Sequence, residues 1–285
     1  MTGKQTNKSG SNYGGNWTID KLNILDEYLM AFTQVFKNQD WSNLVYIDAF
    51  AGSGETITGN NVIVEGSPLI ALNYDFAKYY FFELNKVRME SLKSKIEKEY
   101  PLKKNKTEFI LGDCNDNLPK LIEGLQIKAS TRGVIFLDPY SLELKWETIK
   151  KINDINIDVW YLFPMMANRL LTKDKNKLNE AFRQKLNLLF GSNDWETDLY
   201  KPDAQINFFN EERQQKVNLS KIVEYIIKKI EEVFGYKPEY KMFKNKKNSP
   251  LFLFCGFTTN KSQSARNLVK KITKGVIISI EKGIV

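Results

Sequence analysis

The sequence predicts an α/β protein in which helices cover both faces of a mostly parallel β-sheet. Strand-like apolar runs recur at regular intervals from residue 44 onward, and helix-like segments lie between them. The runs are almost continuously apolar, which is typical of parallel strands that are buried on both faces. Strands alternating with helices imply right-handed crossovers and therefore a doubly wound sheet.

The elements are expected in the following order. A helix is predicted over 18–37, where apolar side chains recur at helical spacing and Thr18 can act as the N-cap. The five strands that follow are predicted at 44–50, 79–84, 107–111, 133–138 and 157–163. The helices between them are predicted at 67–77, 86–99, 115–125 and 145–154. Ser67 followed by Pro68 indicates an N-cap with proline at the first helical position.

The C-terminal part of the chain departs from this alternation. A long helix is predicted over 211–234, and two strands at 236–243 and 249–258 are joined by the polar turn KNKKN. They predict a C-terminal antiparallel hairpin, and a last helix follows at 262–273. Residues 165–206 are too long for a simple connection and are expected to form an insertion on the carboxyl side of the sheet. Residues 1–16 are expected to be a flexible polar tail, and 17–285 a single domain.

Composition removes several classes of function. The 285 residues contain no histidine and two cysteines, Cys114 and Cys255, which are expected in different strand-like segments. Histidine-based catalysis, histidine-ligated metal and a disulfide framework are therefore excluded, and we expect no metal site. The formal charge of +8 favours an anionic partner, nucleic acid first, although lysine is frequent throughout the chain. The sequence shows no apolar run of membrane-spanning length and no signal peptide, which predicts a soluble cytoplasmic protein.

An acidic residue stands at or just after the end of each of the first four predicted strands. They are Asp48, Glu83, Asp113 and Asp138. In an open α/β sheet, ligands bind outside the carboxyl ends of the strands, so these side chains are expected to surround one site. Such a set of carboxylates suits a cationic nucleoside and would repel a pyrophosphate.

The glycines after the first strand support the same site. Gly52 and Gly54 let the backbone approach a ligand and adopt positive φ, although they can also simply form a tight turn. A dinucleotide fingerprint is incomplete because Ile57 stands where the third glycine belongs, and no Gly-Lys-Ser/Thr follows to make a Walker A loop. In a nucleoside-sulfonium pocket, Asp48 would lie near an ammonium, directly or through water. Glu83 would accept the ribose hydroxyls, and Asp113 an adenine amino group, with Cys114 near the ring.

The stretches YIDAFAGSGE, GSPLIAL, FFELN, GDCND, FLDPYSLELKW and NSPLFLFCGFTTN resemble class I S-adenosylmethionine-dependent methyltransferases, and more narrowly the three-Cys-motif partner proteins. The resemblance covers about residues 20–273. It implies the Rossmann-like class I methyltransferase fold with a seven-stranded sheet, bound S-adenosylmethionine, and a separate partner protein that carries the three cysteines. The implied cofactor-binding residues are Asp48, Ala49, Phe50, Gly52, Ser53, Gly54, Glu83, Leu84, Asp113, Cys114 and Asp138. The serine after DPY departs from the glycine of relatives and affects local loop geometry.

The acceptor is indicated by LDPY, which is one proline short of the D-P-P-Y of DNA amino-methylating enzymes. Asp138 and the carbonyl of Pro139 could hold an exocyclic amine while the ring of Tyr140 stacks on an extruded base. The alternative is that Asp-Pro only ends the strand and Tyr140 packs under the next helix. Arg169 and Lys173 in the insertion are candidates for phosphate contacts, and a solvated helix explains them equally well.

Other candidate residues are expected to be structural. Lys21 could reach a cofactor carboxylate, but a surface position is the simpler expectation. Trp41, Trp146, Trp160 and Trp195 are expected in the core. The sequence thus predicts an S-adenosylmethionine-dependent N-methyltransferase that acts on a nucleic acid or nucleotide-like acceptor. The alternatives are a non-catalytic, cofactor-binding subunit that positions a metal-cluster partner enzyme, and a small-molecule methyltransferase.

Overall fold

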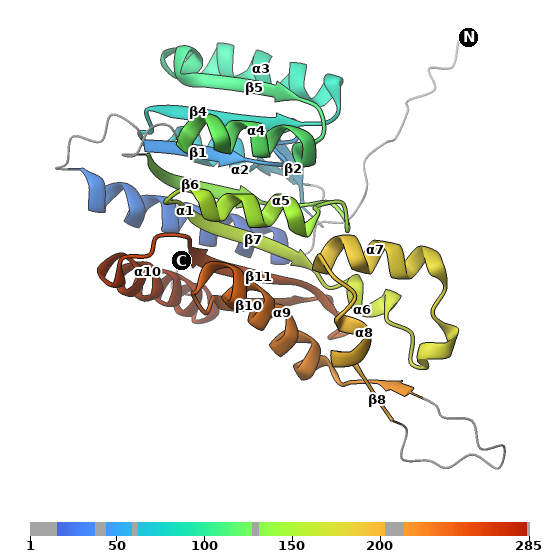
Figure 1. The fold of residues 1–285 in the computed structure, drawn as a ribbon. Helices are drawn as coiled ribbons and strands as arrows, with labels where there is room; N and C mark the ends of the chain where they lie inside the picture. Colours follow the sequence, from blue (N-terminus) through green and yellow to red (C-terminus); the bar gives the residue numbers. More distant parts are fainter. Residues whose placement is uncertain (1–15, 38–43, 59–61, 127–130, 203–213, 284–285) are drawn as a thin grey trace, which may run out of the picture.

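The structure is a computed structural model that describes residues 16–37, 44–58, 62–126, 131–202 and 214–283. Its central sheet contains the strands β1 Leu44–Asp48, β4 Lys78–Glu83, β5 Thr107–Leu111, β6 Arg132–Leu137, β7 Asp158–Pro164, β10 Glu239–Lys244 and β11 Pro250–Thr258. They lie in the order β10-β11-β7-β6-β1-β4-β5 (Figure 1). The five strands from β5 to β7 pair in parallel, and β11 pairs antiparallel with both β7 and β10. The expected seven-stranded, mostly parallel sheet with a C-terminal antiparallel hairpin is confirmed.

Helices cover both faces of this sheet. One face packs against α1 Asn16–Phe36, α2 Ser67–Leu72, α3 Lys86–Glu99 and α10 Gln263–Glu281. The other face packs against α4 Cys114–Gln126, α5 Trp146–Lys151 and α9 Leu219–Phe234. Successive side chains of β4 alternate between the two layers: Tyr79 and Phe81 join one core, and Tyr80 and Phe82 join the other. This period of two within an uninterrupted apolar run is the signature of a strand that is buried on both sides.

The described elements also include two short hairpins and three 3₁₀ turns. The first hairpin joins β2 Glu55–Ile57 to β3 Ile63–Glu65, directly after the glycine loop, in a segment for which no strand was predicted. The second joins β8 Tyr200–Pro202 to β9 Gln214–Lys216. The 3₁₀ turns are η1 Pro101–Lys106, η2 Ile152–Asp154 and η3 Lys175–Lys177.

Several expected helix ends were wrong. Helix α1 already begins at Asn16, so the buried Thr18 lies in its first turn and is not the N-cap. Gly66 is the N-cap of α2, which places Ser67 one position further into the helix, where its hydroxyl hydrogen-bonds Asp48. Helix α2 ends at Leu72 rather than near 77.

The two C-terminal helices also differ from expectation. Helix α9 begins only at Leu219, because the side chain of Asn218 accepts a hydrogen bond from the Lys221 N–H and caps it. Residues 214–216, expected to be helical, form β9 instead. Helix α10 continues eight residues beyond the predicted end at 273, to Glu281.

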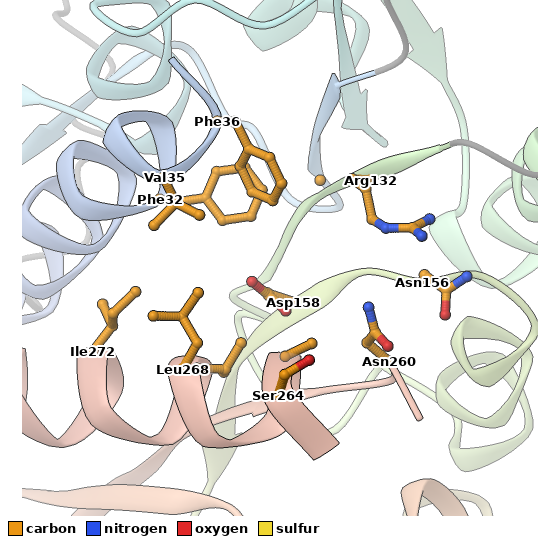
Figure 2. A pocket seen from close by; sticks show the side chains of 13 residues that line it. Phe32, Val35, Phe36, Arg132, Asn156, Asp158, Asn260, Ser264, Leu268 and Ile272 are labelled. Atoms are coloured by element: carbon orange, nitrogen blue, oxygen red, sulfur yellow. The ribbon is translucent and has the colours of Figure 1, made fainter. Parts of the chain in front are cut away.

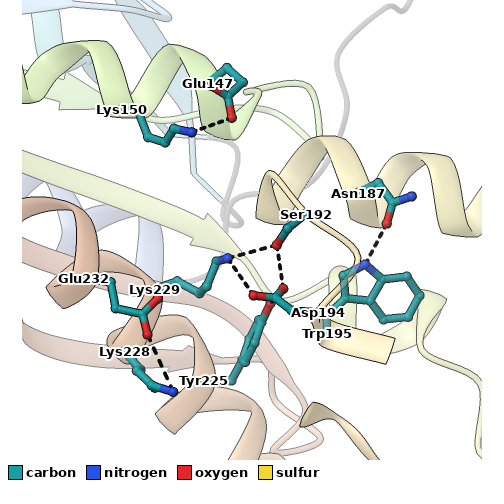
Figure 3. A network of polar contacts seen from close by, with 10 residues as sticks. All are labelled: Glu147, Lys150, Asn187, Ser192, Asp194, Trp195, Tyr225, Lys228, Lys229 and Glu232. Carbon is teal, nitrogen blue, oxygen red and sulfur yellow. Dashed lines mark hydrogen bonds and ion pairs between the residues drawn. The ribbon is translucent and has the colours of Figure 1, made fainter. Parts of the chain in front are cut away.

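The insertion after β7 contains α6 Ala167–Leu170, α7 Glu180–Phe190 and α8 Trp195–Asp198. A polar network joins it to α9 (Figure 3). Asp194 accepts hydrogen bonds from the hydroxyls of Ser192 at 2.5 Å and Tyr225 at 2.6 Å, and from Lys229 Nζ at 3.1 Å. Since Tyr225 and Lys229 belong to α9, these contacts fasten the loop between α7 and α8 to the body of the protein.

Most of the described tryptophan and cysteine side chains are buried in the core. Trp146, Trp160 and Trp195 are buried in the core, as expected, and Trp41 lies outside the described residues, as do residues 1–15 of the expected tail. Both cysteines are buried and free, but Cys114 begins α4 and does not belong to a strand. Among the described helices, none is both long and apolar enough to cross a bilayer. The described residues contain no group of three or more side chains suited to hold a metal ion.

Candidate functional site

The carboxyl ends of β5, β4, β1 and β6 are neighbours along one edge of the sheet. The strand order brings together four acidic residues that are far apart in the sequence. Asp48 ends β1, Glu83 ends β4, Asp113 follows β5 and Asp138 follows β6. The juxtaposition expected from the sequence is therefore present at this edge.

The loop after β1 is shaped by two glycines that have different tasks. Gly52 has φ of +65°, and an added Cβ would meet no atom within 4 Å, so its backbone borders open space. Gly54 has φ of +85°, but its Cβ would come within 2.8 Å of Leu92 Cδ1. Gly54 is therefore packed closely against Leu92 of α3, whereas the backbone of Gly52 borders open space, and the positive φ of both favours glycine. Ser53 donates its hydroxyl to the Glu55 carbonyl at 3.3 Å, toward the β2–β3 hairpin.

Glu83 is held by two backbone N–H groups from different loops. Gly52 donates to its Oε2 at 2.9 Å, and Asn85 donates to its Oε1 at 2.7 Å. Each carboxylate oxygen keeps a second lone pair with which it can accept from a ligand hydroxyl. The next residue, Leu84, has 70% of its surface exposed and offers an apolar contact at the same edge. A preorganised acceptor beside an exposed apolar side chain suits a nucleoside.

Asp48 is completely buried. Its Oδ1 accepts from the Phe50 N–H at 3.1 Å, and its Oδ2 from the Tyr46 hydroxyl at 3.4 Å. Burial, reinforced by the nearby charge of Asp138, raises the pKa of Asp48 to about 7, against the opposing influence of Ser67, Phe50 and Lys21. Direct contact between Asp48 and a ligand does not fit this burial. Asp48 instead holds the loop and places a titratable negative charge behind it.

The flanking residues Ala49 and Phe50 belong to the same buried turn. The Ala49 N–H donates to the Phe136 carbonyl at 3.0 Å, and the Ala51 N–H to the Phe82 carbonyl at 2.8 Å. These bonds extend β1 toward both neighbouring strands. Ala49 is buried, and Phe50 is half-buried against the core that contains α4. Ala49 is therefore hidden behind the edge, whereas Phe50 is partly accessible there.

Asp113 and Asn115 organise the edge beyond β5. The exposed Asp113 accepts at Oδ1 from the backbone N–H of Asn115 at 2.8 Å and from its Nδ2 at 2.9 Å. Asn115 Nδ2 also donates to the Glu143 carbonyl at 2.9 Å, and its Oδ1 accepts from the Lys145 N–H and the Thr148 hydroxyl, each at 2.9 Å.

Asn115 thus ties the loop after β5 to the loop after β6. This role could not be predicted from the sequence, because nothing in GDCND shows that its asparagine contacts a segment 28 residues away. Burial raises the pKa of Cys114 to about 12, so this thiol packs in the core and is not a nucleophile at neutral pH.

Asp138 forms an ion pair through Oδ2 with Nζ of Lys21, which comes from α1. The expected surface position of Lys21 was wrong, since only 8% of the residue is exposed. Helix α1 packs across the sheet, and its first turns direct Lys21 toward the strand ends, 5.4 Å from the centre of the Trp17 ring. The ammonium offsets part of the negative charge that Asp48 and Asp138 create together. Among the described residues, no other hydrogen bond to the Asp138 carboxylate is present, and Oδ1 is available as an acceptor.

Tyr140 follows Asp138 and the buried Pro139, and its side chain is 70% exposed. The alternative that it packs under the next helix was therefore wrong. Its backbone N–H donates to Glu143 Oε1 at 2.8 Å, which fixes the turn that presents the ring.

The neighbouring Ser141 hydroxyl contacts Met166 Sδ at 3.8 Å, so the insertion begins beside this loop. Arg169 lies in α6 and Lys173 follows it, and both are exposed. Among the described residues, no hydrogen bond or cation–π contact joins either side chain to Tyr140.

No protein-family model matches the chain, and no curated protein matches it. Solved structures do align with it. The O-methyltransferase TomG from Streptomyces achromogenes, in complex with S-adenosylmethionine, is 11% identical over 84% of this chain and 79% of its own, with a TM-score of 0.44. An rRNA methylase from Streptococcus thermophilus is 13% identical over 75% and 86%, with a TM-score of 0.34. Protein LPL1258 from Legionella pneumophila is 14% identical over 75% and 92%, with a TM-score of 0.37.

Proposed function

We propose that this chain binds S-adenosylmethionine at the carboxyl edge of its sheet and transfers the methyl group to an amino group of a nucleic acid or nucleotide-like acceptor. The observation that carries the proposal is the Glu83 carboxylate, held by two backbone N–H groups beside the open backbone of Gly52. A rigid double acceptor next to a glycine loop at positive φ matches the cis hydroxyls of a ribose.

The remaining residues of the edge fit the other parts of this cofactor. Leu84 would lie against the adenine ring, and Asp113 would accept from its amino group. The methionine end would follow the loop of Gly52, where the buried charge of Asp48 favours a cation even without contact. A nearby sulfonium or ammonium would in turn stabilise the ionised form of Asp48, whose pKa burial raises to about 7.

The acceptor amine would be held by Asp138 Oδ1 and the carbonyl of Pro139, with Tyr140 stacking on the base. When bound, S-adenosylmethionine supplies an electrophilic methyl group on sulfur. That methyl group would pass to the amine nitrogen as the carbon–sulfur bond breaks, and Asp138 would take the proton that the amine loses and release it to solvent. Two acceptors that orient one lone pair suffice for this reaction, since proximity and alignment supply most of the rate. No histidine is needed.

The preference for a nucleic acid rests on charge and on the exposed aromatic ring. The chain carries a formal +8, and Arg169 and Lys173 are exposed in the insertion that begins beside the Tyr140 loop. An extruded base needs an aromatic platform and phosphate contacts in this arrangement. The resemblance to three-Cys-motif partner proteins extends the proposal to a partner protein, so the assay is to be run with and without one.

The test is transfer of labelled methyl groups from S-adenosylmethionine to DNA and RNA. Wild-type protein is expected to label one of them, and Asp138→Asn to reduce the rate by about 100-fold while cofactor binding, measured by calorimetry, stays within about twofold. Glu147→Gln is the matched control, because Glu147 is an exposed carboxylate that pairs with Lys150 on α5. Failure to bind S-adenosylmethionine would overturn the proposal, and binding with unchanged transfer in Asp138→Asn would overturn the role of Asp138.

A further inference from the structure

A cavity of about 340 Å³ lies at the opposite edge of the sheet, where β6 and β7 begin (Figure 2). Helices α1 and α10 and the segments that flank β6, β7 and β11 enclose it. Its volume falls within the range of small-molecule sites. Because the cavity lies where the parallel strands begin, the length of the strands separates it from the proposed methyl-transfer edge.

One half of the cavity is apolar. Phe32 and Phe36 project from the last turns of α1, and their ring centres are 4.8 Å apart. Leu268 and Ile272 of α10 face these rings across the cavity (Figure 2). Leu268 is 40% exposed although it lies beside apolar side chains. A ligand that covered these surfaces would remove apolar area from water, which is favourable in proportion to the area. This half therefore suits a hydrocarbon chain of several carbon atoms.

The two charged residues of the other half already have partners within the protein. Asp158 accepts from the Tyr28 hydroxyl at 2.8 Å and also hydrogen-bonds Thr258. Arg132 donates from Nη1 to the Thr131 carbonyl at 2.8 Å, and its positive charge acts on Asp158. Burial raises the pKa of Asp158 to about 6, against these hydrogen bonds and this charge, so the carboxyl group is mostly ionised at neutral pH. The two opposite charges offset each other and present little net charge to a ligand.

Two asparagine amides remain available at this polar end. The side chain of Asn156 makes no hydrogen bond within the part of the chain that the structure describes. Asn260 Oδ1 accepts from the Ser262 N–H at 2.9 Å. Its Nδ2 makes no hydrogen bond to another described residue and points into the cavity (Figure 2). An uncharged hydroxyl group matches this pair of amides, because it can accept a hydrogen bond from one and donate to the other.

A charged head group fits this end of the cavity poorly. Removing an ammonium or a carboxylate from water is costly unless an opposite charge compensates it, and both charges here are already offset by each other. A hydroxyl group loses less on burial and regains two hydrogen bonds.

We propose that this cavity binds an uncharged aliphatic alcohol of medium chain length. Its hydroxyl would accept from Asn260 Nδ2 and donate to Asn156 Oδ1. Its hydrocarbon chain would lie between the phenylalanines of α1 and the aliphatic residues of α10.

The test is calorimetric titration of the full chain at neutral pH with 1-octanol, octanoate and octylamine, which share the length of their carbon chain and differ in the head group. Saturable binding of 1-octanol is expected below about 1 mM, and at least 10-fold weaker binding of each ion. 1-Butanol, whose chain covers less of the apolar half, is also expected to bind at least 10-fold more weakly. Absence of saturable 1-octanol binding in this range, or equal affinity for either ion, would overturn the proposal.

Variants locate the binding to this cavity. Ala265→Trp is expected to weaken binding of 1-octanol at least 10-fold, because the new side chain on α10 fills the cavity without removing a polar contact. Lys271→Trp is the matched control, since Lys271 is exposed on the same helix and does not line the cavity. Equal affinity in Ala265→Trp and wild type would overturn the assignment, whatever happens at the methyl-transfer edge.

A second variant tests the polar end and does not depend on how the fold tolerates a new tryptophan. Asn156→Ala is expected to weaken binding of 1-octanol about fivefold, through the loss of one hydrogen bond. Unchanged affinity in this variant would overturn the proposed placement of the hydroxyl.

Discussion

The backbone N–H of Gly52 donates to Glu83 Oε2 across 2.9 Å, although 31 residues separate the two in the sequence. This bond joins the loop after β1 to the end of β4, so the two features that would meet a bound nucleoside are positioned by one contact. The open space at the Gly52 Cβ position and the orientation of the carboxylate therefore depend on each other. A substitution at Gly52 tests this dependence.

Gly52→Ala is expected to reduce the affinity for S-adenosylmethionine by at least 10-fold, because the new methyl group enters the space beside Glu83. Its stability should fall by only about 1–2 kcal/mol, the cost of a residue other than glycine at positive φ. Gly235→Ala is the matched control: Gly235 has φ of +60° at the end of α9, far from this edge. It should lose similar stability and bind the cofactor normally. Equal affinities in the two variants, measured by calorimetry, would contradict the model.

Asp48 is expected to make stability depend on pH. Its pKa is raised from 3.8 to about 7, so the folded state binds a proton more tightly than the unfolded state. The stabilisation that this proton gives to the folded state is fully present below about pH 4 and is lost as the pH rises through 7. Asp48→Asn removes this dependence. The unfolding free energy of the variant should therefore increase relative to that of wild type by up to about 4 kcal/mol as the pH rises from 4 to 8. Urea unfolding at a series of pH values measures the difference. Parallel profiles would show that Asp48 ionises normally.

Lys21→Met is expected to destabilise the protein by about 3 kcal/mol, because it leaves Asp138 without its partner in a largely buried position. The pKa of Asp48 should also rise further, since Lys21 lowers it. Adding Asp138→Asn to the first substitution should recover part of the loss. Lys150→Met, which breaks an exposed pair on α5, should cost less than about 1 kcal/mol. Chemical denaturation of wild type and the three variants completes the comparison, and a loss of stability in Lys21→Met no larger than in Lys150→Met would refute the coupling.

The lowered pKa of Asp194 predicts a second pH dependence, a loss of folding stability at acidic pH. Burial alone would raise its pKa, but hydrogen bonds from Ser192, Tyr225 and Lys229 outweigh burial and bring the pKa to about 2. A lowered pKa stabilises the folded state above the unfolded value near 3.8, and this stabilisation is lost as the pH falls through 2. Wild type should therefore lose stability relative to Asp194→Asn between pH 4 and 2. Thermal unfolding followed by circular dichroism tests this expectation. If the difference in stability between wild type and Asp194→Asn does not decrease between pH 4 and 2, the result would argue against the network of Figure 3.

The sheet could be predicted from the sequence because each strand is marked by a local apolar run. The segment TEFIL coincides with β5, and the helix expected at 86–99 coincides with α3. The acids at the strand ends could also be identified, since parallel strands must end at one edge. Such features depend on neighbours in the chain or on a general rule of topology.

What escaped prediction depends on contacts between distant segments. The apolar residues after Lys21 recur at helical spacing, and this pattern is consistent with an exposed position for Lys21. Its partner Asp138 lies 117 residues away in the sequence. Strands β2 and β3 have only three residues each, and Ile57 and Ile63 are exposed there, so no burial pattern distinguished them from a loop. The helices of the insertion were not predicted one by one. Helix α7 does bury Leu186, Leu189 and Phe190 at helical spacing, but α6 and α8 have only four residues and one buried residue each, which is too short for an apolar period.

The antiparallel position of β11 has a consequence for biosynthesis. Because β11 separates β7 from β10, the edge of β7 has no partner until the ribosome has delivered the chain through Thr258. Until then, the parallel strands of the sheet end in an unpaired, strongly apolar edge strand. Such edges promote aggregation of nascent chains. Molecules released before that point should need chaperones to stay dispersed, whereas those released after it should not.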